Sequence, residues 1–296
     1  MEEHRKHRID SAEAMVAAVR HFGIIPFFKC GVPGWSVEEL TPPEHWFFSS
    51  DELGPWDWKI DVVREGDIAY GKFLGGKAAF ATVEFYAHLM NWRRSLPKYR
   101  AALGEKHPAK TRSEKLMKAL SPAALSLIKE NGAASSTEIR AAVTAAVTPS
   151  LIRSLGASYK ANLVPVKKSV CDTVVQFLEM GTWTVIGDFT RVYRGPNAEY
   201  SGWQRSSHTT PDALFGNPAA SGRAATVDAT VPFWAKFIDP TMGEDNPMTN
   251  PSSSGTDRPR NPLELDCTPA ESREFLIRHV RSFFPDADDK TLSKIF

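Results

Sequence analysis

Residues 166–189 read VKKSVCDTVVQFLEMGTWTVIGDF, and this stretch decides the fold. Its apolar residues share one face of a helix that is expected over about residues 165–180: Val170, Val174, Phe177 and Leu178. Two β-like segments follow at residues 182–189 and 199–204, and the turn between them is Arg194-Gly195-Pro196-Asn197. The stretch therefore predicts a helix that leads directly into a β-hairpin.

Two further helices are expected before this one. Residues 115–129 carry an apolar stripe that ends at Asn131-Gly132, and Ser135-Ser136-Thr137-Glu138 is a capping box that opens a short Ala-rich helix. Three helices followed by a β-hairpin is the order of a winged helix-turn-helix, although the long segment between the second and third helices is atypical.

The rest of the chain supplies an α+β fold around this unit. A helix that ends at Gly23, a strand at residues 24–28, and a hairpin of residues 68–73 and 78–83 joined through Gly75-Gly76 are expected first. Past Pro211 the chain is rich in Gly, Pro and Ser before a last helix at residues 270–284. The predicted divisions are an N-terminal α/β portion (1–110), a winged helix-turn-helix (111–216) and a loop-rich C-terminal extension (217–296).

Composition limits the functional classes. The 296 residues are 42% hydrophobic and 24% charged, as in ordinary globular proteins. The three cysteines lie far apart and the eight histidines form no HxH or HxxxH pair, so neither a metal nor a cofactor is expected. No apolar run approaches about 20 residues and no signal core follows the N-terminus, which predicts a cytoplasmic protein without a membrane span.

Charge is distributed unevenly along the chain. The formal net charge is +1, yet residues 91–205 hold 18 basic and 8 acidic residues, a net charge of +10. Such a concentration of cations attracts polyanions; the alternative is a solvated face that balances acidic neighbours. The positions expected to contact DNA phosphates are Lys167 and Lys168 at the start of the third helix, Arg194 at the tip of the hairpin, Arg153 and Lys160.

The segment Gly54-Pro55-Trp56-Asp57-Trp58-Lys59 is the second candidate site. Interpreted as a loop, it makes Trp56 and Trp58 an aromatic platform for a base, with Lys59 and Lys77 completing a pocket. Asp57 or Glu84 would then act as the catalytic carboxylate. The alternatives are a packed aromatic corner in which Asp57 pairs with Lys59 or Lys77, and a helix-capping role for Glu84.

These residues resemble a known family. The blocks that carry the resemblance are Gly54 to Lys59, Ala69-Tyr70-Gly71-Lys72-Phe73, Glu84-Phe85-Tyr86, Ile186-Gly187-Asp188-Phe189 and Tyr200-Ser201-Gly202-Trp203. Together they look like the AlkZ-related proteins of bacteria over roughly residues 20–216. Those proteins are similar to the AlkZ DNA glycosylases, which excise alkylated or crosslinked purines. The resemblance implies a winged-helix fold and a role on DNA.

One departure from the glycosylases bears on function. They use a Gln-x-Gln or Gln-x-Asp pair to position the attacking water, whereas Gln176 and Gln204 here are followed two residues later by Leu178 and Ser206. The leading hypothesis is therefore a winged-helix protein that binds double-stranded DNA without this pair. The alternatives are a glycosylase that acts on alkylated purines through Asp57 or Glu84, and a non-catalytic protein-interaction module.

Overall fold

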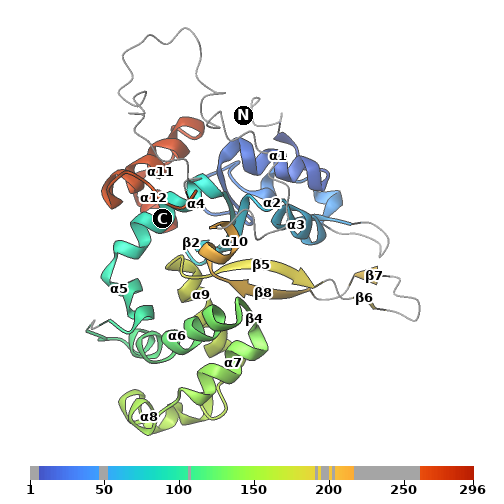
Figure 1. Ribbon diagram of the computed structural model, residues 1–296. Helices are drawn as coiled ribbons and strands as arrows, with labels where there is room; N and C mark the ends of the chain where they lie inside the picture. The colour runs from blue at the N-terminus through green and yellow to red at the C-terminus, as the bar shows by residue number, and fades with distance from the viewer. Residues whose placement is uncertain are drawn as a thin grey trace.

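The computed structural model describes residues 7–46, 53–105, 108–190, 193–194, 200–201, 204–216 and 261–296, with the side chains of residues 157, 193–194 and 200–201 excepted. Helices and small antiparallel sheets alternate along these residues, which confirms the α+β class. Figure 1 shows the elements of the N-terminal residues and the C-terminal helices at one end of the molecule and α6, α7 and α8 at the other.

The N-terminal residues build helices around a three-stranded sheet with the order β1-β3-β2. Its elements are α1 (Ala12–Phe22), β1 (Ile24–Pro26), α2 (Val37–Leu40), a 3-10 turn (Pro43–His45), α3 (Pro55–Arg64), β2 (Ile68–Leu74), β3 (Lys77–Thr82) and α4 (Val83–Ser95). The predicted hairpin is confirmed as β2 and β3. Gly75 and Gly76 form its turn with φ angles of 56° and 78°, a region that favours glycine.

The middle of the chain has the predicted order of helices, with an added segment. Its elements are α5 (Pro97–Arg100), a 3-10 turn (Ala101–Leu103), α6 (Arg112–Asn131), β4 (Ala133–Ser135), α7 (Ser136–Ala145), α8 (Pro149–Leu155), a 3-10 segment (Ala157–Asn162) and α9 (Lys168–Met180). The capping box is confirmed, because the Ser135 hydroxyl accepts from the Glu138 N–H and Glu138 accepts from the Ser135 N–H.

A second sheet follows α9, and its order is β4-β8-β5. The strands are β5 (Val185–Thr190), the short pair β6 (Tyr193–Arg194) and β7 (Tyr200–Ser201), and β8 (Arg205–Thr209), before α10 (Pro211–Phe215). The hairpin predicted from residues 182–189 and 199–204 therefore pairs mainly through residues 205–209 on its second arm. Strand β4 precedes α7, whereas β5 and β8 follow α9. The sheet therefore joins the start and the end of the segment that contains α7, α8 and α9.

The C-terminal helices belong to the N-terminal core. Helices α11 (Pro269–Phe283) and α12 (Asp289–Ile295) bury Leu276, Val280, Leu292 and Ile295 in the cluster that also contains Phe22, and α11 lies beside α4 (Figure 1). The helix predicted at residues 270–284 is confirmed as α11, and residues 217–260 of the predicted loop-rich extension lie outside the described part. A second cluster lies among α6, α7, α8 and α9.

Helix α9 joins the two clusters through its C-terminal end. The Glu179 carboxylate, in a residue only 1% exposed, accepts from the Lys72 N–H of β2 at 2.9 Å. Its other oxygen lies 3.2 Å from His208 Nδ1 on β8, a close polar contact outside hydrogen-bond geometry. One turn earlier, Gln176 donates to the Gly76 carbonyl, and a Cβ on Gly76 would overlap the Gln176 amide.

Arg93 of α4 holds the same end of α9. The residue is 1% exposed, and its guanidinium donates to the carbonyl oxygens of Met180, Phe73 and Phe296. These acceptors come from the last residue of α9, from β2 and from the residue after α12.

No described helix is long and apolar enough to cross a membrane.

Replacing Glu179 with alanine is expected to lower the free energy of unfolding by about 3 kcal/mol. The substitution leaves the Lys72 N–H buried without its acceptor and removes the carboxylate that lies beside the buried His208 ring. Urea denaturation followed by circular dichroism measures the change. The control is Glu130→Ala on the exposed surface of α6, expected to change stability by no more than about 0.5 kcal/mol. Equal effects of the two substitutions would contradict a structural role for Glu179.

Candidate functional site

The segment that carries Trp56, Asp57, Trp58 and Lys59 is the first two turns of α3 rather than a loop. Pro55 occupies the first helical position after Gly54, where its missing N–H costs nothing, so the Gly-Pro pair starts a helix here. Successive residues of a helix point about 100° apart, so the two indoles do not share a face as they would in an extended loop. Trp56 is 45% exposed and Trp58 is 6% exposed.

Lys59 is buried against two aromatic rings. Its Nζ lies 4.6 Å from the ring centre of Trp56 and 5.0 Å from that of Phe189 on β5, and the residue is 7% exposed. Burial lowers the pKa of Lys59 to about 8, and the negative charge of Asp57 offsets only part of that effect. About a fifth of the amine is therefore neutral at about pH 7.4, far more than for a lysine in water.

Asp57 contacts Gln204, the residue immediately before β8. Gln204 Nε2 donates to Asp57 Oδ1 at 3.2 Å and to the Trp56 carbonyl at 2.7 Å. Gln204 Oε1 is buried and has no hydrogen-bond partner among the described residues. The arrangement brings an amide to the carboxylate of Asp57, while the amine of Lys59 lies against the rings of Trp56 and Phe189.

Strand β5 is held against α3 by Arg64. The Arg64 guanidinium donates to Asp188 Oδ1 at 3.0 Å and to the Phe189 carbonyl at 3.2 Å. These contacts place the Phe189 ring over Lys59. Neither Phe189 nor Gln204 was expected at this site, because 125 residues or more separate them from α3 and no local sequence pattern indicates such a contact.

Trp56 packs against a group of aromatic side chains. Its ring centre lies 5.3 Å from that of Phe27, 5.6 Å from that of Phe28 and 6.3 Å from that of Trp46. Trp58 has a different neighbour, His45, at 5.4 Å. The exposed aromatic surface is therefore formed around Trp56, whereas Trp58 packs in the core.

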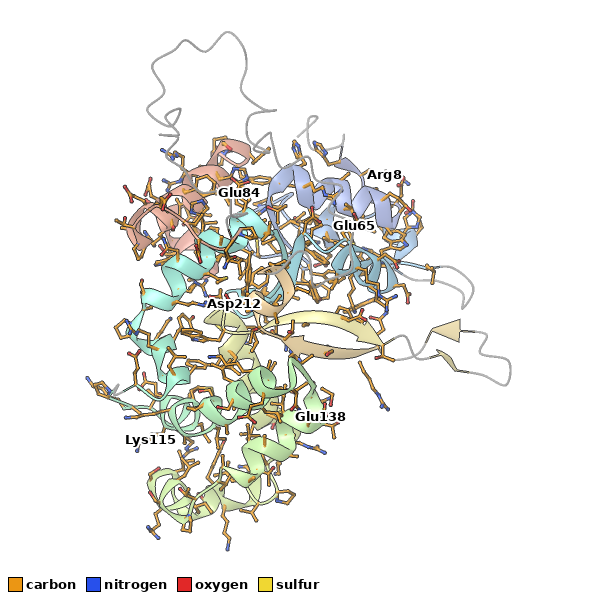
Figure 2. All side chains as sticks on the ribbon, viewed as in Figure 1. Arg8, Glu65, Glu84, Lys115, Glu138 and Asp212 are labelled. Carbon is orange, nitrogen blue, oxygen red and sulfur yellow. The ribbon has the colours of Figure 1, made fainter. Side chains whose placement is uncertain are left out.

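Glu84 and Lys77 have other surroundings. Glu84 lies in the first turn of α4, on the side of the molecule that carries α11 (Figure 2), and burial raises the pKa of its carboxyl. The residue that precedes α4 is Thr82, so Glu84 does not occupy the capping position. Lys77 Nζ donates to the Lys29 carbonyl at 2.5 Å.

The cationic candidates lie on the helical segment. Lys167 is the residue before α9 and Lys168 is its first residue; both are exposed, as are Arg153 in α8 and Lys160 in the following 3-10 segment. Arg194 lies in β6, and its side chain is outside the described residues. Among the described residues no side chain caps the N-terminus of α9, and the first turn of this helix contains no acidic residue.

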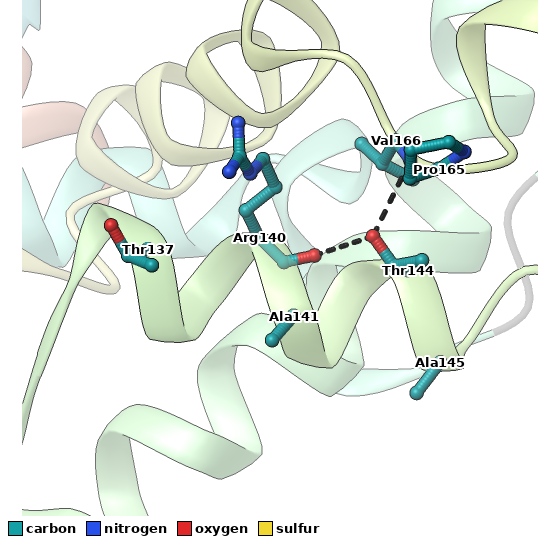
Figure 3. A pocket seen from close by; sticks show the side chains of 7 residues that line it. All are labelled: Thr137, Arg140, Ala141, Thr144, Ala145, Pro165 and Val166. Carbon is teal, nitrogen blue, oxygen red and sulfur yellow. Dashed lines mark hydrogen bonds between the residues drawn. The ribbon is translucent and has the colours of Figure 1, made fainter.

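A hollow lies beside the start of α9. It has a volume of about 530 Å³ and is lined by Thr137, Arg140, Ala141, Thr144, Ala145, Pro165 and Val166 (Figure 3). Thr144 Oγ1 donates to the Arg140 carbonyl at 2.7 Å and accepts from the Val166 N–H at 3.4 Å, which ties α7 to the chain entering α9. Arg140 is an exposed cation that the sequence patterns did not single out, although it lies on the helix that the capping box predicts.

No group of three or more His, Cys, Asp or Glu side chains suited to a metal ion occurs within the described part of the chain.

A family model described as AlkZ related matches residues 9–229, more than half of the chain, so the protein belongs to the AlkZ-related family. This confirms the resemblance found in the sequence. Comparisons with curated proteins and with solved structures found no match.

Lys59 is expected to make stability depend on alkaline pH. The pKa is about 8 in the folded protein and 10.5 in the unfolded chain, so between these values the unfolded chain binds a proton that the folded protein lacks. The free energy of unfolding of the wild type, minus that of Lys59→Met, should therefore rise by about 3 kcal/mol from pH 7.5 to pH 10.5. Urea denaturation of both proteins measures this, and a difference that stays constant with pH would show that Lys59 titrates normally.

Proposed function

We propose that residues 111–216 form a winged helix-turn-helix that binds double-stranded DNA. The order α6, β4, α7, α9, β5, β8, with a sheet ordered β4-β8-β5, supports the winged-helix assignment. In this assignment α9 is the recognition helix, and the chain between β5 and β8 is the wing. Helix α8 and the 3-10 segment are an insertion between the second and third helices.

The observation that carries the proposal is the asymmetry of α9. Its C-terminal half is covered, since Gln176 and Glu179 contact β2 and its hairpin turn. Its N-terminal half exposes Lys168, Ser169 and Thr173. A recognition helix contacts DNA mainly through its N-terminal residues. The N-terminal half of α9, which would contact DNA, is therefore the exposed half.

The electrostatics of this end favour a phosphate. Unpaired N–H groups and the helix dipole make the N-terminus of α9 positive, and Lys167 and Lys168 add two charges at that end. Arg140, on the neighbouring α7, adds another exposed cation beside the hollow before α9. The positive charges of Lys167 and Lys168 repel the positive end of the helix dipole, and a bound phosphate would offset that repulsion.

The double substitution Lys167→Glu and Lys168→Glu is expected to weaken binding to a 20-base-pair duplex at least tenfold at 50 mM salt. It should also reduce the slope of log K against log salt by about 2, since about one unit of slope is lost with each phosphate contact. Fluorescence anisotropy between 50 and 200 mM salt measures both quantities. The control is Lys290→Glu with Lys294→Glu on the exposed side of α12, which makes the same change in net charge.

Equal weakening by the control pair would mean that binding depends on net charge alone. No binding of the wild type at 50 mM salt would contradict the proposal and favour the protein-interaction module.

A second candidate function is excision of alkylated purines, and the contact between Asp57 and Gln204 favours it. The sequence lacks a Gln-x-Asp pair, yet the amide of Gln204 meets the carboxylate of Asp57 in space. The carboxylate and Gln204 Oε1, which has no hydrogen-bond partner among the described residues, are acceptors suited to hold a water molecule. The exposed Trp56 ring offers a stacking surface for an extruded base.

Asp57→Asn is expected to lower excision of methylated purines at least a hundredfold and to change the affinity for duplex DNA less than twofold. The amide keeps the shape of the side chain but loses the negative charge that activates water. Release of methylated bases from treated duplex DNA measures excision, with Asp61→Asn on the same helix as the control. Absence of excision by the wild type would contradict this second function and leave the binding proposal unaffected.

A further inference from the structure

The surroundings of Lys59 differ from those of a lysine that binds a DNA phosphate. Among the described residues Lys59 is the single buried lysine, and its amine lies against the rings of Trp56 and Phe189. Phosphate contacts are made by exposed cations, which keep their charge and reach outward. An amine enclosed by rings is poorly placed for that purpose.

Such an enclosed amine is suited to nucleophilic chemistry. A lysine in water is protonated at neutral pH and has no free lone pair, whereas removal from water favours the neutral amine. The pKa of about 8 for Lys59 is the result expected from this burial. Neutral lysine amines in apolar surroundings condense with carbonyl groups.

The covering ring gives a reason to expect a nucleic-acid substrate. Trp56 lies over Nζ and is 45% exposed, so rotation of this indole would uncover the amine. An exposed indole also stacks with bases, which would place the sugar of an adjacent nucleotide near the amine. The aldehyde available in such a strand is C1′ of a deoxyribose that has lost its base.

We propose that Lys59 forms an imine with the ring-opened aldehyde of an abasic site in DNA. The Nζ lone pair attacks C1′ to form a C–N bond, the C=O π bond opens, and one amine proton moves to the oxygen, which becomes a hydroxyl. The second amine proton moves to that hydroxyl, which leaves as water as the C=N bond forms. No oxidant or reductant takes part, and addition of water reverses the step. The proposal rests on the proposed DNA binding, and it follows directly from base excision, which produces abasic sites.

The test is reductive trapping with the full chain. A labelled duplex with one abasic site is incubated with the protein and sodium borohydride, which reduces an imine to a stable amine. The expected result is a protein–DNA band on a denaturing gel, with the attached lysine identified as Lys59 by peptide mass spectrometry. Adducts confined to other lysines, or no adduct, would overturn the proposal.

Two variants make the assignment specific. Lys59→Met should lower the adduct yield at least tenfold, whereas Lys72→Met, an exposed lysine on the neighbouring strand β2, should retain it. Peptide mapping on the wild type stands even if Lys59→Met fails to fold. Anisotropy with the same abasic duplex separates the two proposals, because binding without an adduct contradicts imine formation alone, and absence of binding contradicts both.

Discussion

The burial of Glu179 and Arg93 around the C-terminal end of α9 is the constraint on which the rest of the structure depends. A buried carboxylate and a buried guanidinium are costly unless they are paired or hydrogen-bonded. Glu179 accepts from the Lys72 N–H and lies beside His208, and the two terminal nitrogens of Arg93 donate to carbonyls from α9, β2 and Phe296, whereas its Nε has no partner among the described residues. Satisfying both charges requires the two hydrophobic clusters to meet in one arrangement, which also recruits the C-terminal segment.

This anchoring divides α9 into two halves with different roles. The covered half fixes the orientation of the helix, and the open half presents Lys167 and Lys168. Arg64 holds β5 against α3, and Phe189 and Gln204 contact Lys59 and Asp57 there. The proposed DNA surface and the α3 cluster lie on different elements, and the sheet β4-β8-β5 connects them, because β8 carries His208 beside Glu179 and β5 carries Phe189 beside Lys59.

Local patterns in the sequence predicted the elements but not their long-range contacts. The capping box at Ser135, the Gly75-Gly76 hairpin and the apolar stripe of α9 each arise from neighbours within a few residues. The contact of Gln204 with Asp57 joins residues 147 positions apart, and burial of Glu179 depends on a strand 107 positions away. The helix that starts at Pro55 differs from the predicted loop because a Gly-Pro pair is compatible with a turn and with the first position of a helix.

The measurement that tests the account most directly is amide hydrogen exchange of the full chain with and without a 20-base-pair duplex at low salt. If α9 meets DNA through its open half, binding should slow exchange at residues 167–173 and at the nearby Arg140 side of α7. Residues 176–180 are already protected by their contacts with β2 and should change little. Protection confined to α11 and α12, with residues 167–173 unchanged, would contradict the assignment of α9 as the recognition helix.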